Sequence, residues 1–175
     1  MVDILLAVLN RTLVAGTPLL LATLGEILAE RSGVLNLGVE GMMAIGAVAA
    51  FATAMSTASP WLALLVAVAA GALAAALHAF VSVTLKANQV VSGLALTMFG
   101  LGLSGLLGKP YIGRPLGHRL AGLPLPLLAD IPALGRVLFS QDPLLYLALL
   151  AGLLLWLLLS KTRWGIAVRS VGENP

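Results

Sequence analysis

The feature that most constrains the fold of this chain is a long stretch without charge. Residues 41–85 contain no Asp, Glu, Lys or Arg. An α-helix that crosses a bilayer needs about 20 predominantly apolar residues. The stretch therefore predicts two transmembrane helices separated near Pro60, because one helix of this length would far exceed the thickness of the hydrocarbon layer.

Composition supports a membrane protein. Of the 175 residues, 60% are hydrophobic and 10% are charged, whereas soluble domains are about 45–50% apolar and about 25% charged. The net charge of +3 comes from single basic residues at the ends of apolar runs, which is typical of membrane-flanking charge and argues against nucleic-acid binding. The chain has no cysteine, which excludes disulfides and thiolate-bound metals.

The hydrophobic pattern predicts an all-α fold, a polytopic transmembrane helical bundle with five spans. Each span is bounded by charged residues or by Pro and Gly. We expect residues 1–10 to form a short amphipathic lead-in instead of a cleavable signal, and Pro18 to kink the first span. The predicted spans are residues 12–28, 33–58, 61–85, 90–108 and 143–160.

Small residues recur at every fourth position in two of the spans. In lipid, such a stripe lets helix backbones approach closely, so the third and fourth spans are expected to be interior helices. The alternative is that Ala and Gly are simply abundant in such helices. The stripes are Ala67, Gly71, Ala75 and Ala79 in the third span, and Gly100, Ser104 and Gly108 in the fourth.

The second span begins with GVLNLGVEG, residues 33–41. Its three glycines disfavour a continuous helix and predict a broken one near residues 33–41. Non-helical backbone at membrane depth persists only where protein or a water-filled cavity surrounds it. If the segment were locally helical, Asn36 and Glu40 would share one face.

Glu40 has two explanations at this stage. An ionisable side chain inside a span marks a pathway or a paired structural site by default. A carboxylate at this position also suits headgroup water or the positive end of the helix that follows. The sequence does not show how deep in the membrane Glu40 lies, so both explanations stay open.

A second polar stretch, LKANQVVSG, introduces the fourth span at residues 85–93. Asn88 and Gln89 are suited either to hydrogen-bonding a polar solute or to bonding neighbouring helices, and for Ser92 the second role is favoured. We expect His78 to be a satisfied interior imidazole. No second His or carboxylate stands at a metal-binding interval, so no metal site is predicted.

Two segments outside the spans are candidates for partner contacts. Five prolines exclude a regular spanning helix from residues 109–142, which form either a functional segment at the membrane face or an interfacial cap. KTRWGIAVRSVGENP, residues 161–175, is basic and follows a span directly. It is either a positive-inside stop signal or a docking loop for a soluble partner, and the charge pattern favours a cytoplasmic C-terminus.

Three motifs in this order, ERSGVLNLGVEGMMAIGA, LKANQVVSGLALTMFGLGLSG and KTRWGIAVRSVGENP, resemble the permease subunits of ATP-binding-cassette importers of the sugar, nucleoside and branched-chain amino acid group. The resemblance covers the chain from about Thr12 onward and is nearest to the nucleoside permeases. It implies a multi-pass protein of the bacterial plasma (inner) membrane that works with a second permease subunit, cytoplasmic ATP-binding subunits and an extracytoplasmic solute-binding protein.

The resemblance also implies roles for particular residues. It places residues 109–142 outside and the break from Asn36 to Glu40 along the translocation pathway. We expect Asn36, Glu40 and Gln89 to touch or shape the substrate pathway. The resemblance implies that residues 161–175 form a cytoplasmic loop facing the ATPase. The contact residues of that loop are Arg163, Gly165, Arg169, Gly172, Glu173 and Asn174.

No covalent chemistry is expected of this chain. It has no G-x-x-x-x-G-K-[ST] phosphate loop, so ATP and Mg²⁺ would be bound by the partner ATPase, and no cofactor is expected here. Permeases of the group have about twice as many spans, so residues 1–175 are expected to be one transmembrane permease domain, the N-terminal part, as a fragment or a split gene product. A sugar or branched-chain amino acid importer and an ion-coupled secondary transporter remain alternatives; an intramembrane enzyme is less favoured, since no H-E-x-x-H pair appears.

Overall fold

The structure, a computed structural model, describes residues 1–118, 120–124, 126, 129, 131 and 134–173. Within these residues it contains helices and no strand, which confirms the all-α prediction. The elements are α1 (Val2–Arg31), α2 (Val39–Thr57), α3 (Pro60–Ala79), the π-helical turn η1 (Phe80–Thr84), α4 (Gln89–Gly108), the 3₁₀ turn η2 (Lys109–Tyr111), α5 (Leu134–Leu138), α6 (Pro143–Lys161) and α7 (Arg163–Glu173).

Five of the described helices are long and apolar enough to cross a membrane: α1, α2, α3 with η1, α4 with η2, and α6. Both ends of the third, fourth and fifth spans lie within about three residues of the prediction, and α2 ends as predicted but begins at Val39. The first span ends near its predicted limit, but α1 begins at Val2, because the expected lead-in continues into the span without a break. The correction has a physical reason: residues 1–15 contain no Gly or Pro that would stop the helix.

Side-chain caps explain where three of the spans start. The side chains of Ser59, Asn88 and Asp142 accept hydrogen bonds from backbone N–H groups in the first turns of α3, α4 and α6. Pro60 and Pro143 occupy the first helical positions of α3 and α6, where a missing N–H has no cost. The polar residues that the sequence places before these apolar runs therefore set the helix boundaries.

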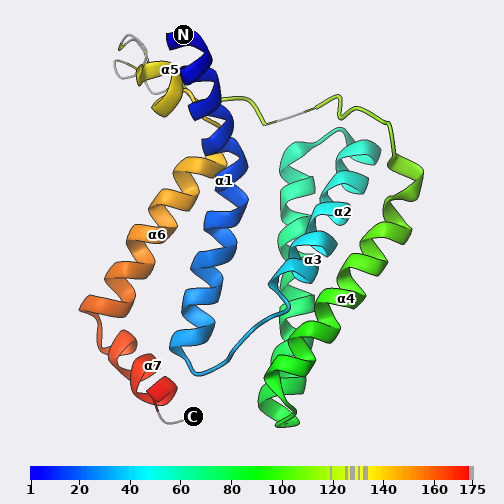
Figure 1. Cartoon of the computed structure of the whole chain (residues 1–175), viewed down its shortest axis with the longest axis vertical. Helices are drawn as coiled ribbons and strands as arrows, with labels where there is room; N and C mark the ends of the chain where they lie inside the picture. The colour runs from blue at the N-terminus through cyan, green and yellow to red at the C-terminus, as the bar shows by residue number, and fades with distance from the viewer. Residues whose placement is uncertain (119, 125, 127–128, 130, 132–133, 174–175) are drawn as a thin grey trace. The chain divides into compact units, whose positions relative to one another are not determined.

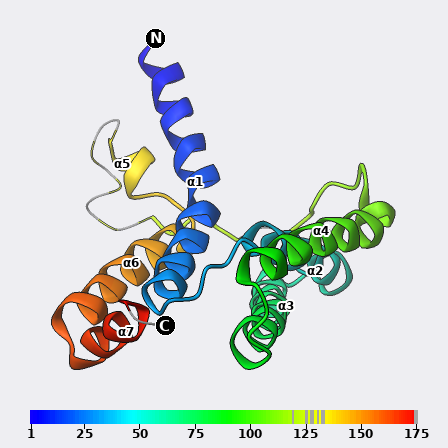
Figure 2. The same cartoon turned by 60° about the horizontal axis from the view of Figure 1, so that its bottom comes forward.

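Packing divides the chain into two compact units (Figure 1). The α1/α6 unit comprises Met1–Leu28 and Leu120–Arg169, and the α2–α4 unit comprises Ala29–Arg119 and Ser170–Pro175. Figures 1 and 2 both show α2, α3 and α4 side by side. The expectation that residues 1–175 form one transmembrane domain stays a prediction.

In the α2–α4 unit, α2 packs against both α3 and α4. A Cβ atom added to Gly41 would lie 2.5 Å from the carbonyl oxygen of Leu96, and one added to Gly100 would lie 2.5 Å from that of Gly41. The two backbones therefore touch, which confirms the predicted close approach at Gly100. On the α3 side, a Cβ on Gly46 would lie 3.4 Å from the Ala67 oxygen.

The predicted stripe on α3 makes a close approach at Ala67 but was wrong beyond it, since a Cβ on Gly71 would meet nothing within 4 Å among the described residues. Ala75 and Ala79 are exposed, and the buried face of α3 instead contains Ala63, Ala74 and His78. Four residues span about 400° of a helix with 3.6 residues per turn. A strict four-residue stripe therefore drifts off a flat contact by about 40° per step.

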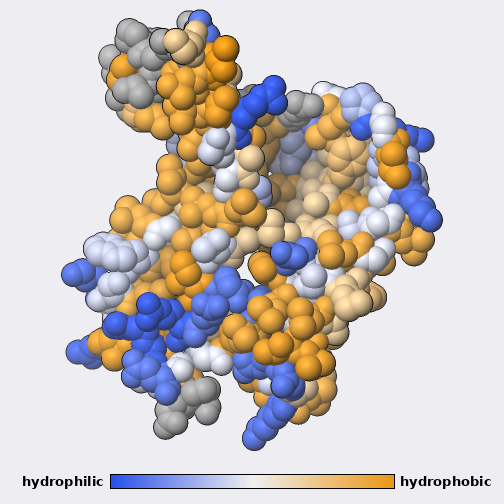
Figure 3. All heavy atoms as spheres, in the orientation of Figure 1, coloured by the Kyte–Doolittle hydropathy of each residue, from blue (hydrophilic) through white to orange (hydrophobic). Residues whose placement is uncertain are grey.

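Large apolar side chains cover the outer faces of the helices. In Figure 3 hydrophobic atoms dominate the visible sides of the helices, and hydrophilic atoms gather where α6 turns into α7. More than half of the surface of Leu65, Leu73, Met98 and Leu153 is exposed. Such surfaces are stable in lipid and mark the chain as a multi-pass membrane protein.

The described part of residues 109–142 contains η2 and the short helix α5 and no spanning helix, as the prolines predicted; Pro132 lies outside the described residues. Its end is fixed by Gln141, which is 4% exposed. The Gln141 side chain donates to Asn10 Oδ1 (3.0 Å) and to the oxygen of Val137, and its backbone N–H donates to Tyr146 Oη (3.1 Å). This polar cluster ties the segment to α1 and α6.

Candidate functional site

The link between α1 and α2, residues 32–38, is not helical. We call it the broken segment. It confirms the predicted break near residues 33–41, although helical structure resumes at Val39. Gly33 has φ 87°, a left-handed conformation that glycine adopts without strain. The N–H groups of Gly33 and Val34 bond back to the oxygens of Glu30 and Ala29 (3.0 and 3.1 Å), which ends α1.

Gln89, at the start of α4, holds the broken segment by its backbone. Its Oε1 accepts from the N–H of Leu35 (2.6 Å), and its Nε2 donates to the oxygen of Gly33 (3.5 Å). One amide side chain thus satisfies a donor and an acceptor that have no helical partner. The bonds join residues 54 and 56 positions apart in the sequence.

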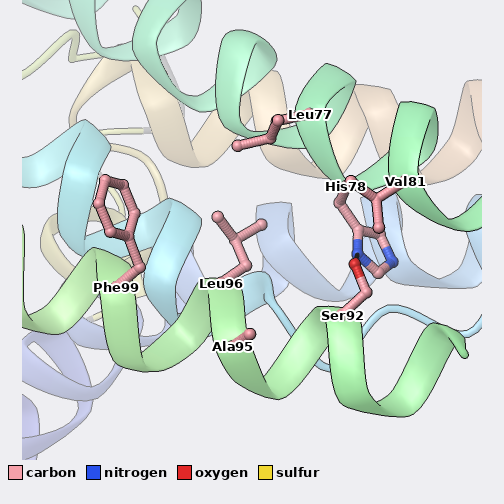
Figure 4. A pocket seen from close by; sticks show the side chains of 7 residues that line it. All are labelled: Leu77, His78, Val81, Ser92, Ala95, Leu96 and Phe99. Atoms are coloured by element: carbon pink, nitrogen blue, oxygen red, sulfur yellow. Dashed lines mark hydrogen bonds between the residues drawn. The ribbon is translucent and has the colours of Figure 1, made fainter. Parts of the chain in front are cut away.

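His78 reaches the same segment from α3. Its Nε2 lies 3.3 Å from the oxygen of Leu35, and its Nδ1 lies 3.1 Å from Ser92 Oγ on α4. The imidazole is 4% exposed. Figure 4 shows the ring turned toward Ser92 across the gap between the two helices. The expectations of a satisfied interior imidazole at His78 and of a helix-joining role for Ser92 are confirmed.

Two further residues of α4 support the broken segment. Thr97 Oγ1 donates to the oxygen of Leu37 (2.7 Å). A Cβ atom added to Gly93 would lie 2.7 Å from the Leu37 nitrogen, so the segment lies directly on the α4 backbone. Together with Gln89 and Ser92, these residues form one face of α4.

Asn36 and Glu40 do not share a helical face, because the condition for it, a locally helical segment, is not met at residues 32–38. Asn36 lies in the broken segment, where its Oδ1 accepts from the N–H of Gly38 (3.0 Å) and its Nδ2 lies 3.8 Å from Met42 Sδ. Glu40 is exposed in the first turn of α2, where the helix dipole favours a carboxylate. The two side chains are therefore positioned by different elements.

A groove of about 310 Å³ lies between α3, η1 and α4 beside His78 (Figure 4). Five of the seven lining residues are apolar, and the polar ones are His78 and Ser92, which bond to each other. The lining residues are Leu77, His78, Val81, Ser92, Ala95, Leu96 and Phe99. The groove thus gives one side of the His78–Ser92 pair an apolar environment.

The C-terminal segment is a helix and not the predicted loop. α7 covers Arg163–Glu173, because the sequence after Thr162 lacks proline as far as Asn174 and Thr162 Oγ1 accepts from the N–H of Gly165 (3.1 Å). Asn174 lies outside the described residues.

The two glycines of α7 face other backbone. A Cβ on Gly165 would clash with the oxygens of Leu158 and Leu159, and one on Gly172 with the oxygen of Arg31. Arg163, Arg169 and Glu173 are exposed. The residues named for this segment therefore divide into two that pack the helix and three that present charge.

Sequence reasoning did not identify the contacts of His78, Gly93 and Thr97 with the broken segment. A signal was present: Gly93, Thr97 and Gly100 recur at helical spacing on the side of α4 that begins with Gln89. Among the described residues, no group of three or more His, Asp or Glu could hold a metal ion.

Residues 8–175 match the family described as branched-chain amino acid transport system / permease component. Similar chains include a putative glucose ABC transporter permease protein of Haloferax volcanii (42% identical; 95% of this chain, 52% of the relative) and the guanosine ABC transporter permease protein of Bacillus subtilis (39%; 99% and 58%). A nucleoside ABC transporter permease protein of Lactococcus lactis is 36% identical (99% and 58%). No solved structure matches.

The chain belongs to this permease family and is a multi-pass protein of the plasma membrane. It spans about half the length of the curated relatives it matches.

Proposed function

We propose that the chain is part of the membrane permease of an ATP-driven importer and that its solute is a nucleoside. The observation that carries the proposal is the broken segment, a stretch of non-helical backbone held against α3 and α4 by side chains from both. In a membrane protein such backbone is stable only where it is buried in protein or lines an aqueous path. Relatives named for guanosine and nucleoside transport support the solute class.

A sugar is the second candidate solute, because the 42% identical relative is named as a putative glucose permease. The test is uptake by proteoliposomes that contain the full-length permease with its ATPase, in the presence of its binding protein. We expect ATP-dependent uptake of tritiated guanosine that excess unlabelled glucose does not reduce. Glucose uptake alone would replace the solute, and uptake that ignores ATP but stops with an uncoupler would identify an ion-coupled transporter.

Asn36, Glu40 and Gln89 shape the substrate pathway in this proposal. Glu40 supplies an exposed charge to the pathway, while Asn36 and Gln89 bond the backbone of the neighbouring broken segment. We expect Glu40→Gln to lower uptake about tenfold or more, on the scale of one lost charged hydrogen bond, with the complex still assembled. Glu30→Gln is the matched control, since Glu30 is also exposed and lies outside the broken segment. Normal uptake by Glu40→Gln would remove Glu40 from the pathway.

α7 faces the cytoplasmic ATP-binding subunit in this proposal, and that subunit binds ATP and Mg²⁺. In α7, Arg163, Arg169 and Glu173 are exposed and offer polar contacts, while Gly165 and Gly172 pack the helix against other backbone. Asn174, which lies outside the described residues, is proposed as a further contact residue. Arg169→Glu should weaken co-purification of the ATPase, whereas Arg11→Glu on exposed α1 should not. Unchanged co-purification of Arg169→Glu would support the simpler stop-signal role.

The remaining partners follow from the same proposal. A second permease subunit completes the translocation unit, and residues 109–142 face an extracytoplasmic solute-binding protein. The cluster around Gln141 supports this placement, because it anchors the segment to the ends of α1 and α6. Cross-linking of the binding protein to residues 109–142 in the assembled importer tests it.

A further inference from the structure

His78 is the one described side chain that bonds both the broken segment and α4 from a third element, α3. The oxygen of Leu35 carries no hydrogen, so Nε2 of the ring must donate to it. In a neutral imidazole the other nitrogen is then an acceptor, and Ser92 Oγ–H donates to Nδ1. The hydrogen-bond partners thus select a single tautomer.

The ring stands where two irregular segments meet. The α-helical part of α3 ends at Ala79, and the π-helical turn η1 begins at the next residue. Ser82 Oγ donates to the oxygen of His78 (2.6 Å) within that turn. π-Helical turns inside helices are rare and are frequently found at functional sites. The His78 ring therefore reaches the broken segment from the last turn of α3, immediately before η1.

The surroundings strengthen these bonds. The ring is 4% exposed, and apart from Ser92 the neighbouring groove is lined by apolar side chains. In such a low-dielectric setting a hydrogen bond is stronger and an unpaired polar group costs more than in water. Loss of the His78–Leu35 bond would leave the oxygen of Leu35 without this partner and would remove a side-chain link between the broken segment and α3.

We infer that His78 is a positioning residue for transport. It touches no solute and transfers no proton; it acts through the oxygen of Leu35 and fixes the broken segment, and with it the start of α2 at Glu40, against α3 and α4. The inference rests on the proposed function and adds a residue that it does not use. The His78–Leu35 bond, and not the volume of the ring, carries the effect.

The experiment compares two amides at position 78 in the full-length permease, reconstituted with its ATPase and binding protein. Gln places an amide near the position of Nε2 and keeps a donor for Leu35. Asn places its amide near Nδ1, so it keeps the partner Ser92 and loses Leu35. The readouts are the KM and the maximal rate of tritiated guanosine uptake, each per assembled transporter.

We expect His78→Gln to keep at least about half of the maximal rate and His78→Asn to lose about tenfold, the effect of one or two buried hydrogen bonds, with KM changed far less. Ser82→Ala is the matched control and should behave as the unmodified protein. Ser82 is buried beside His78, but its bond stays within its own turn. Equal rates for Gln and Asn, or a loss in Ser82→Ala equal to that in His78→Asn, would overturn the inference.

A thiol measurement keeps this test separate from the proposed function. These 175 residues contain no cysteine, and Leu35 is 37% exposed, so Leu35→Cys places a single thiol among them as a reporter on the segment. The same transporter with Leu35 unchanged measures the background labelling, which is subtracted. Maleimide should label it several-fold faster with His78→Asn than with His78→Gln. If guanosine is not transported at all, the proposed function fails and this labelling difference still decides the role of His78: equal labelling rates would overturn it.

Discussion

The two units of this chain are held together in different ways. In the α2–α4 unit, backbones meet directly at Gly41 and Gly100, and side chains of α3 and α4 bond the backbone of the broken segment. In the α1/α6 unit, α1 meets α6 through side chains: a Cβ on Gly152 would lie at an ordinary 3.7 Å from the Leu24 side chain, and the close backbone contact of Gly165 lies instead where α7 follows α6. The polar cluster of that unit lies at one end, around Gln141.

The difference indicates where this permease needs a fixed backbone. Lipid-embedded helices associate through close packing and interhelical hydrogen bonds, and the α2–α4 unit uses both at the place where its helix is interrupted. In the α1/α6 unit, by contrast, α1 and α6 each run unbroken across their spans, and Pro18 is the residue inside α1 that lacks a backbone N–H to donate. This unit therefore tolerates looser, side-chain packing.

The largest effect is expected at the glycine contact. Gly41→Ala or Gly100→Ala would place a Cβ 2.5 Å from a backbone oxygen, which forces the helices apart and lowers the free energy of unfolding by about 3 kcal/mol, the upper end of the usual cost of overpacking. Gly102→Ala and Gly105→Ala on the same helix meet nothing within 4 Å among the described residues, and they should be neutral or stabilising. Thermal unfolding in detergent measures both pairs.

Gly25→Ala in α1 extends the comparison to the other unit. A Cβ at this position would meet nothing within 4 Å among the described residues, so the variant should not be destabilised. If Gly41→Ala were as stable as Gly25→Ala, the contrast between the units would be lost.

A smaller effect is expected at Gln141. Gln141→Leu removes the bonds to Asn10 and Val137 in a buried site, and should destabilise the α1/α6 unit by about 2 kcal/mol. Limited proteolysis should then cut residues 109–142 faster, while maleimide labelling of Leu35→Cys in the other unit stays unchanged. A rise in that labelling would show that the two units do not respond independently.

The smallest effect is expected from removing the hydroxyl group of a single threonine, and two threonines are compared. Thr97→Val removes a bond to Leu37 in the broken segment, whereas Thr23→Val removes one to Leu19 in its own helix. We expect Thr97→Val to lower stability by about 1 kcal/mol and Thr23→Val by much less, because the Leu19 oxygen keeps its helical partner. Thermal unfolding of the two variants measures the difference. Equal shifts in Tm would show that the Thr97–Leu37 bond stabilises the protein no more than a bond within one helix.

Much of the fold could be predicted because the length of an apolar run and the capping, Gly or Pro residues at its ends are local properties of the sequence. Asn88 and Asp142 cap helices within three residues of themselves, and the three glycines of residues 33–41 predict the break. The contacts of His78 and Thr97 could not be derived in this way, since their partners are 43 and 60 residues away. The α7 helix was missed because its residues were interpreted as a connection to a partner and not by their own helical propensity.

The candidate site was predicted only in part, because its residues can be found in the sequence but their long-range contacts cannot. Gln89 was identified as a polar residue at a helix start, but its bonds to Leu35 and Gly33 depend on how α4 packs against the broken segment. Glu40 was identified by its charge alone, and its place in the first turn of α2 agrees with the dipole explanation. Its pathway role stays a prediction.

The central claim is that the broken segment is held inside the protein by α3 and α4. A cryo-EM map of the full-length transporter in lipid nanodiscs, at a resolution that shows side chains, tests it most directly. It should show residues 32–38 non-helical along α4, with the His78 ring and the Gln89 amide bonded to Leu35. A segment that continues α2 as a regular helix, or that lies in bulk water away from α4, would contradict the claim.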